Sequence, residues 1–571
     1  MSLHFTRVGP APVSERAEQH WVRMRDGIRL ATDVYLPAPP DDVRVPTVLV
    51  RLPYDKNSRY VYFDEIAARF TARGYAVVVQ DVRGKFRSEG QTLPFLREGD
   101  DGYDTLDWIV QQAWSDGVVG MFGDSYYGFT QWAAVASEHP ALRAIVPRVT
   151  TVDFNATTQG CPDAPPGVGR PVWLEGIDYY AHYWVDQGLY EYEPDRSIRP
   201  VVEQYEEAFR AIGARSAWFD TLVPHFTDLF PARGRHPYDA RPVPVLHCVG
   251  WFDNILLPHL RDYLALAARP GWDAVQYLWA GAVDHENYRL ADAPATAGTD
   301  HAVNPAALDR MLPQYVDPAL GFFDVFLKGA RPVTELAKVR WELGRAEDGG
   351  AWRTSSAWPP PEAVERTFWL ARPEDAAGPL PGGALVDSPP ETPESESSAR
   401  WAYDPDDLVP SDVPNSFAYL HSYPDLARTA ARDDVLVFSG AALTEPLDLA
   451  GPLGLRLHVS GSAPTFDVFV KLLDVGPDGR AHQIARGEVS VRGELAPDEV
   501  PVDLGHTGYR VRAGHRLAVL LASSDYPLFL PSSGSEDNPW TTPAAKPSAQ
   551  TLRTGAARPS RLTVSVLPGR D

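Results

Sequence analysis

The sequence has little cysteine, with only Cys161 and Cys248 among 571 residues. Two cysteines cannot form a disulfide framework or a cysteine-rich zinc site, so neither is expected to hold the fold together. Cys248 lies in the apolar run 243–249 and is predicted to be a small buried side chain of a strand. No metal ion and no cofactor is predicted from the rest of the sequence.

Long apolar runs are also missing. No stretch of about 18 apolar residues occurs, so no membrane-spanning helix is predicted. The first residues lack the charged and then apolar pattern of a signal peptide, which favours a cytoplasmic protein.

Positive charge is in deficit, because 53 Lys and Arg residues face 76 Asp and Glu, a net charge of −23. Nucleic acid and anionic membranes both require a basic surface, so neither is an expected partner. The sequence leaves the oligomeric state open, homo-oligomers included.

The chain is long enough for several domains, and strands alternate with helices in two regions, 1–150 and 239–358. The strands are nearly continuous runs of Val, Ile and Leu, which is typical of a parallel sheet covered on both faces. These runs lie at residues 46–52, 75–81, 118–122, 142–147, 243–249 and 274–280. We therefore predict the two regions to form one α/β hydrolase core with a mostly parallel, doubly wound sheet.

Two other regions depart from this alternation. Residues 151–238 contain two aromatic-rich helical stretches, 173–187 and 201–226, with no strand expected between them. This inserted block predicts a helical cap over the active site, with most of its aromatic side chains packing it onto the sheet and a minority lining a substrate pocket. Residues 359–571 show short alternating strands separated by turns, which predicts a β-sandwich of the jelly-roll type.

A glycine-rich turn joins the strand at 118–122 to the helical run that begins at Phe129. Its sequence is Gly123-Asp124-Ser125-Tyr126-Tyr127-Gly128. Strand, sharp turn with a serine at its tip, then helix is the layout of a nucleophile elbow. The usual pattern is Gly-x-Ser-x-Gly, whereas here the second glycine comes one residue later. A plain turn serine is the alternative interpretation.

Three further polar side chains follow predicted strands. Tyr54, Asp253 and His285 come just after the strands at 46–52, 243–249 and 274–280. The carboxyl ends of parallel strands share one edge of the sheet, and ligands bind there. A serine hydroxyl needs a base to accept its proton and an acid to orient that base. The order serine, acid, histidine is that of α/β hydrolases, so Ser125, Asp253 and His285 are the predicted catalytic residues.

The oxyanion of the tetrahedral intermediate requires hydrogen-bond donors. The backbone N–H of Tyr126 and the hydroxyl of Tyr54 are predicted to supply them. Each assignment has a simpler rival: Asp253 could cap the following helix, Tyr54 could only pack, and Asp284 could form a surface pair with Arg289. Three other histidines compete for the role of base, namely His247, His259 and His301.

The motifs of the chain resemble those of the cocaine-esterase-like branch of the α/β hydrolases. That branch also holds the X-prolyl dipeptidyl aminopeptidases and the α-amino acid ester hydrolases. The resemblance spans nearly the whole chain, from Arg25 to Leu567, and implies the same three-domain order and the catalytic roles given above. Its motifs are Arg-x-Pro-Tyr-Asp-Lys at 51–56, Asp-x-Arg-Gly-x-x-x-Ser-x-Gly at 81–90, Gly-x-Ser-Tyr-x-Gly at 123–128 and Gly-Trp-aromatic-Asp at 250–253, with further matches at 403–405 and 471–481.

One segment departs from the family pattern. Relatives usually carry Gly-Pro-Trp-x-His before the catalytic histidine, whereas this chain has Gly281-Ala282-Val283-Asp284-His285. Relatives that cleave α-amino acyl groups hold the amine with a carboxylate cluster, and no such cluster can be assigned from this sequence.

The predicted function is a serine hydrolase that cleaves a small-molecule acyl ester or amide through an acyl-enzyme. The aromatic cap favours an apolar or aromatic acyl group. The alternatives are an acyltransferase that uses the same acyl-enzyme, an X-prolyl or amino-acyl peptidase, and a non-catalytic relative that binds a ligand.

Overall fold

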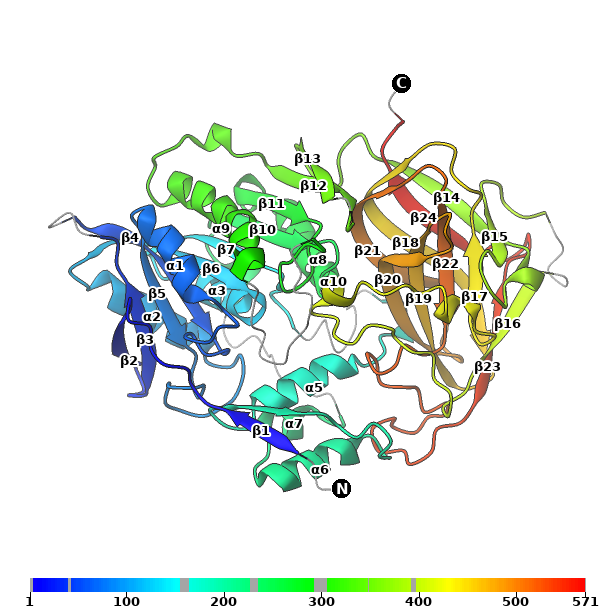
Figure 1. Cartoon of the computed structure of the whole chain (residues 1–571), viewed down its shortest axis with the longest axis horizontal. Coiled ribbons are helices and arrows are strands. Elements are labelled where there is room, and N and C mark those ends of the chain that lie inside the picture. The colour runs from blue at the N-terminus through cyan, green and yellow to red at the C-terminus, as the bar shows by residue number, and fades with distance from the viewer. Residues whose placement is uncertain are drawn as a thin grey trace.

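The computed structural model describes residues 4–38, 43–154, 164–225, 235–291, 305–347, 349–391 and 397–569. Figure 1 shows an α/β part on the left, helices α5, α6 and α7 at the bottom, and a strand-rich domain on the right. Among the described residues, no helix is long and apolar enough to cross a membrane.

The α/β part is built on one twisted sheet whose middle strands are parallel, as predicted. The strand order is β2-β3-β5-β4-β6-β7-β10-β11-β12-β13, with parallel pairing from β5 to β12. The strands are β2 (Glu18–Arg23), β3 (Arg29–Tyr35), β4 (Val45–Leu52), β5 (Ala76–Asp81), β6 (Ser115–Asp124), β7 (Leu142–Arg148), β10 (Val245–Gly250), β11 (Gln276–Gly281), β12 (Val339–Arg345) and β13 (Gly349–Ser355).

Helices cover both faces of this sheet because successive strand residues point to opposite faces. Val48 and Val50 of β4 pack in one core cluster with α1 and α9, and the intervening Leu49 packs in another with α2 and α3. The helices are α1 (Phe63–Ala72), α2 (Glu98–Val110), α3 (Ser125–Ser137), α8 (Leu256–Ala267) and α9 (Pro305–Phe326). Cys248 is buried in β10, as the sequence predicts.

The described part of the inserted segment between β7 and β10 is mostly helical, but one strand, β9, lies between two of its helices. It contains β8 (Val168–Gly169), α5 (Leu174–Tyr183), β9 (Leu189–Tyr192), α6 (Val202–Ile212) and α7 (Ala217–Leu222). The expectation of no intervening strand is therefore wrong, because β9 pairs antiparallel with β1 (Phe5–Val8) at the other end of the sequence. The predicted helix 201–226 is also divided at Gly213, whose φ of 78° is left-handed, and Phe226 lies outside the described residues.

The C-terminal part consists mostly of antiparallel strands. One group pairs in the order β17-β22-β19-β20, and a second pairs in the order β14-β24-β18-β21, with β23 and β16 on the far end of β18. The strands are β14 (Val364–Ala371), β15 (Gly383–Val386), β16 (Ser398–Tyr403), β17 (Leu436–Ser439), β18 (Leu447–Gly461), β19 (Thr465–Val475), β20 (Ala481–Arg492), β21 (Val500–Val511), β22 (Arg516–Ala522), β23 (Ser548–Arg553) and β24 (Arg561–Val566). A short helix, α10 (Tyr419–Ser422), lies on the side that faces the α/β part (Figure 1).

Candidate active site

A sharp turn joins β6 to α3 and carries Ser125 at its tip. Ser125 has a φ of 49°, in the left-handed region that non-glycine residues rarely adopt. A Cβ at Gly123 would lie 1.9 Å from the Tyr127 ring, and a Cβ at Gly128 would lie 2.6 Å from Thr150. The later second glycine therefore serves the same purpose as in the usual pattern, which is close approach of the helix to its neighbour.

The turn is fixed from behind by hydrogen bonds. The Thr150 hydroxyl donates to the carbonyl of Ser125 at 2.6 Å, and the Ser125 N–H donates to the carbonyl of Val149 at 3.2 Å. The Thr150 N–H in turn donates to Nδ1 of His259 at 3.2 Å. Because Nδ1 of His259 accepts, its proton is on Nε2, which lies 3.2 Å from Nδ1 of His247. These two buried histidines thus support the turn and do not face Ser125.

His285 and Asp253 form a buried pair at the ends of β11 and β10. Nδ1 of His285 lies 2.8 Å from Oδ1 of Asp253, and both residues are less than 10 % exposed. The same carboxylate oxygen accepts the N–H of Ile255 at 3.1 Å, so Asp253 caps the turn before α8 as well as contacting the histidine. Burial lowers the pKa of His285, but the carboxylates of Asp253, Glu286 and Asp124 together outweigh it and the net pKa is raised.

Tyr54 lies just past the end of β4 and is buried beside the serine. Its hydroxyl lies close to the Ser125 side chain, the Tyr179 side chain and the backbone N–H of Tyr126. Burial raises the pKa of Tyr54 above its ordinary value, so the phenol remains protonated and can donate. The ring contacts Tyr183 edge-on with centroids 5.5 Å apart.

These side chains meet at a small cavity of about 30 Å³. Ser125, Tyr54 and His285 all line it, and Asp253 lies behind His285. The remaining lining residues are Tyr60, Val61, Asp124, Tyr127, Tyr179, Glu286 and Phe417. The structure thus brings together the four side chains predicted from strand ends, and Tyr126 contributes its backbone.

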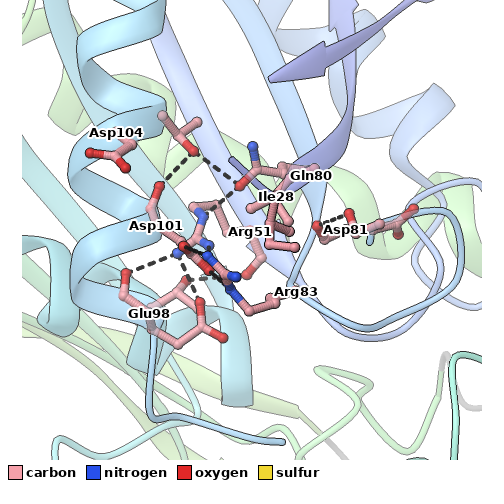
Figure 2. A network of polar contacts seen from close by, with 12 residues as sticks. Ile28, Arg51, Gln80, Asp81, Arg83, Glu98, Asp101 and Asp104 are labelled. Atoms are coloured by element: carbon pink, nitrogen blue, oxygen red, sulfur yellow. Dashed lines mark hydrogen bonds and ion pairs between the residues drawn. The ribbon is translucent and has the colours of Figure 1, made fainter. Parts of the chain in front are cut away.

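The Tyr126 side chain joins a buried polar network through Glu98, and Figure 2 shows Glu98 with Arg51 and Gln80. The Tyr126 hydroxyl donates to Oε1 of Glu98 at 2.8 Å, and Oε2 of Glu98 accepts from Arg51 at 2.8 Å. Arg51 also donates to Oε1 of Gln80 at 2.7 Å. Arg51 is the second-last residue of β4 and lies three residues before Tyr54, so the Glu98 carboxylate connects the backbones that carry Tyr54 and Tyr126.

A second buried network surrounds the residue before the serine. Oδ2 of Asp124 accepts from the hydroxyls of Tyr127 and Tyr315 at 3.1 and 2.6 Å, and from Nδ2 of Asn287 at 3.0 Å. Arg148 lies 3.3 Å from its other oxygen. Burial raises the pKa of Asp124 to about 6 despite the arginine. This network links the serine turn to the loop that carries His285.

The sequence analysis did not identify several residues of the cavity, among them Glu286 and Phe417. Glu286 lines it with its carboxylate accepting from the Tyr60 hydroxyl at 3.0 Å. Adjacency to His285 was the only available signal for it. Phe417 comes from the C-terminal domain, and its ring lies 5.0 Å from the His285 ring. No spacing in the sequence indicates that contact.

Asp284 does not form the surface pair considered from the sequence. It is fully buried, and its two oxygens accept the N–H groups of Tyr288 at 3.2 Å and Leu420 at 3.0 Å. Arg289 instead pairs with the buried Glu342, with N–O distances of 2.5 and 2.7 Å. Asp284, the residue before His285, therefore anchors α10 of the C-terminal domain.

The mostly parallel sheet and the serine turn after β6, with a C-terminal β domain, define an α/β hydrolase. Residues 26–287 match the X-Pro dipeptidyl-peptidase family (S15), and residues 332–563 match the X-Pro dipeptidyl-peptidase C-terminal non-catalytic domain. The cocaine esterase of Rhodococcus sp. (strain MB1 Bresler) is 32 % identical over 560 residues, which cover 89 % of this chain and 90 % of the relative. The chain therefore belongs to the S15 family of serine hydrolases.

Solved structures share the fold along the full length. An aminopeptidase from a marine sediment archaeon, Thaumarchaeota archaeon, superposes with a TM-score of 0.77 at 22 % identity, with 98 % of each chain covered. An α-amino acid ester hydrolase gives a TM-score of 0.75 at 23 % identity, with 97 % of this chain and 98 % of that chain covered.

Proposed function

We propose that the protein hydrolyses a small acyl ester through an acyl-enzyme on Ser125. His285 accepts the proton of the Ser125 hydroxyl while Oγ attacks the acyl carbon. The tetrahedral intermediate collapses, the bond to the leaving alcohol breaks, and His285 gives that proton to the leaving oxygen. Water then repeats the sequence on the acyl-enzyme and releases the carboxylic acid. Asp253 orients the imidazole and stabilises its protonated form.

The oxyanion is stabilised by two donors from different loops. The Tyr54 hydroxyl and the Tyr126 N–H both lie beside the Ser125 side chain, where the carbonyl oxygen of a bound ester would become negative. Donors fixed in a buried site do not have to reorganise as the charge develops. The raised pKa of Tyr54 supports its role as a donor.

The observation that carries this proposal is the convergence of Ser125, Tyr54 and His285 on one cavity, with Asp253 at 2.8 Å from the imidazole. Membership of a family that contains cocaine esterase supports an ester as substrate. A panel of p-nitrophenyl acetate, butyrate and benzoate tests it. We expect turnover of at least one ester that Ser125→Ala abolishes, and turnover of the panel by Ser125→Ala would contradict the assignment.

The acyl group is expected to be compact and apolar or aromatic, because tyrosines and Phe417 make up half of the residues that line the cavity. We therefore expect Phe417→Leu to change the relative rates at which the acetate, butyrate and benzoate esters are hydrolysed. The same acyl-enzyme could pass its acyl group to an alcohol in place of water. Adding methanol to the assay tests for this acyl transfer, which would form the methyl ester.

A second candidate is an amino-acyl hydrolase, and Glu286 is the observation that favours it. Its half-buried carboxylate faces the cavity, and no described Lys or Arg side chain lies within 4 Å of it. Such a charge would attract the ammonium group of an α-amino acyl substrate. If this is correct, alanine p-nitrophenyl ester is preferred over the propionyl ester, and Glu286→Gln removes the preference without removing propionyl turnover.

A further inference from the structure

A second and larger cavity lies between the α/β part and the C-terminal domain. It measures about 260 Å³ and shares no lining residue with the cavity at Ser125. One wall is the loop after β10 and the start of α8, from Trp251 to Leu257, and the opposite wall is formed by β19, β20 and β21. We refer to it as the interdomain cavity. Its volume is close to the lower end, about 300 Å³, of typical small-ligand sites.

The β-strand wall of the interdomain cavity carries two cations side by side. Lys471 of β19 and Arg486 of β20 are directly opposite each other in the antiparallel ladder. Like charges at directly opposite positions repel, so this pair requires a nearby anion. Asp525 supplies one carboxylate, which lies 2.8 Å from Nζ of Lys471 but 3.9 Å from the nearest nitrogen of Arg486.

Arg486 is therefore the cation with unused donors. No described residue accepts a hydrogen bond from its guanidinium, and its side chain is 17 % exposed. The group stacks above the Phe529 ring at 5.2 Å, which fixes its position without satisfying its N–H groups. A guanidinium held in this way presents a planar fork that matches a carboxylate.

The other charges around the cavity are already paired. Arg170 donates to Oε1 of Glu488 at 2.7 Å, and Arg261 donates to Oδ2 of Asp503 at 3.0 Å. The Asp253 carboxylate is engaged by His285. The carboxylates of Glu175 and Glu488 also act on Arg486 electrostatically, but neither accepts a hydrogen bond from it, so its N–H groups are available to an anion in the cavity.

Apolar side chains form much of the remaining wall, which restricts the ligand. They are Leu256, Leu257, Val413, Ile484 and Leu528. A doubly charged anion would be poorly solvated among them, whereas a monoanion with an apolar body would bury that body. We propose that the interdomain cavity binds a small monocarboxylate, with its carboxylate on Arg486 and its apolar body against these side chains.

The proposal has a consequence for regulation that rests on the proposed function. Ester hydrolysis releases a carboxylic acid, which is the class of ligand that this cavity fits. Asp253 and Asn254 line the cavity, so a bound acid would contact the loop that orients His285. The binding itself requires no turnover and can be tested separately.

Calorimetric titration with benzoate, and with benzyl alcohol as the uncharged analogue, tests the site. We expect benzoate to bind the wild-type protein, Arg486→Met to bind it about tenfold or more weakly, and benzyl alcohol to show no such dependence. Arg486→Lys keeps the charge but loses the planar fork, so its affinity for benzoate should lie between those of the wild-type protein and Arg486→Met. It also serves as the test variant if Arg486→Met fails to fold. Arg261→Met removes a paired cation of the same cavity and is the matched control, with unchanged affinity expected.

Three results would overturn the site: no benzoate binding to the wild-type protein, equal binding by Arg486→Met, or an equal loss in Arg261→Met. Ester turnover is measured on the same preparations. Retained binding without turnover would count against the catalytic proposal alone, and turnover without Arg486-dependent binding would count against the carboxylate site alone.

Discussion

Tyr54 is the residue whose side chain distinguishes this site from one built on backbone donors alone. Its hydroxyl lies beside both the Ser125 side chain and the Tyr126 N–H. Removing one oxyanion donor typically costs on the order of 10²-fold in kcat. We expect Tyr54→Phe to lose about that factor in kcat with little change in KM, as measured on a p-nitrophenyl ester. A loss of less than about threefold would remove Tyr54 from this role.

As the proposed base, His285 is expected to set the acid limb of the pH profile. The base must be neutral to accept a proton, and its pKa is raised by Asp253, so kcat/KM should fall as pH decreases through a value above the ordinary 6.5 or so of histidine. In Asp253→Asn the burial that lowers the pKa of His285 remains, while the carboxylate that raises this pKa most is gone. The inflection should therefore move to lower pH while the maximum rate falls. An inflection that stays in place would show that another group titrates.

Residues at strand ends could be predicted because parallel strands place their carboxyl ends at one edge of the sheet. This is how Tyr54, Ser125, Asp253 and His285 could be identified from apolar runs and the residues that follow them. Phe417 could not, since it is 132 positions from His285 and reaches it only when two domains pack together. Asp284 was misjudged for the same reason, because its partner Leu420 belongs to the other domain.

Helix α2 supports the site through Glu98, which joins β4 to α3. It is buried and accepts from Arg51 (Figure 2) and also from the Tyr126 hydroxyl. Glu98→Gln turns one acceptor into a donor that faces a buried arginine, and breaking such a pair costs about 3–5 kcal/mol. We expect a lower free energy of unfolding in urea and a reduced kcat, because both oxyanion donors lose support.

The control for this substitution lies on the same helix. Asp107 is exposed, and Asp107→Asn should change stability by less than about 1 kcal/mol. Equal stability of the two variants would mean that the buried network does not hold the elements together.

The elements themselves were predictable to different degrees. Apolar runs indicated β4, β5, β6, β7, β10 and β11, since a strand buried on both faces is apolar throughout. The four-residue strand β9 was missed because it depends on β1, about 180 positions away, and a short half-buried segment has no pattern of its own.

At the scale of the whole molecule, the loop of His285 contacts the C-terminal domain. Asp284 accepts the N–H of Leu420 across this boundary, and both of its oxygens are used. Asp284→Ala would leave two buried N–H groups without acceptors, each at a cost of about 1–3 kcal/mol. We expect a lowered Tm together with a loss of ester turnover, because Phe417 lies three residues from Leu420 and packs against His285.

An exposed contact across the same boundary provides the comparison. Asp503 pairs with Arg261 of α8, and both side chains are more than one third exposed. Asp503→Ala should therefore change stability by less than about 1 kcal/mol. If both variants behaved alike, the C-terminal domain would not be part of the site.

The most direct measurement is covalent labelling with a fluorophosphonate followed by mass spectrometry of the peptides. An activated serine displaces fluoride from such a probe, whereas an ordinary turn serine does not. The account predicts one adduct, located on Ser125, that is absent in Ser125→Ala and strongly slowed in His285→Ala. Labelling of another residue, or no labelling of the folded protein, would contradict it.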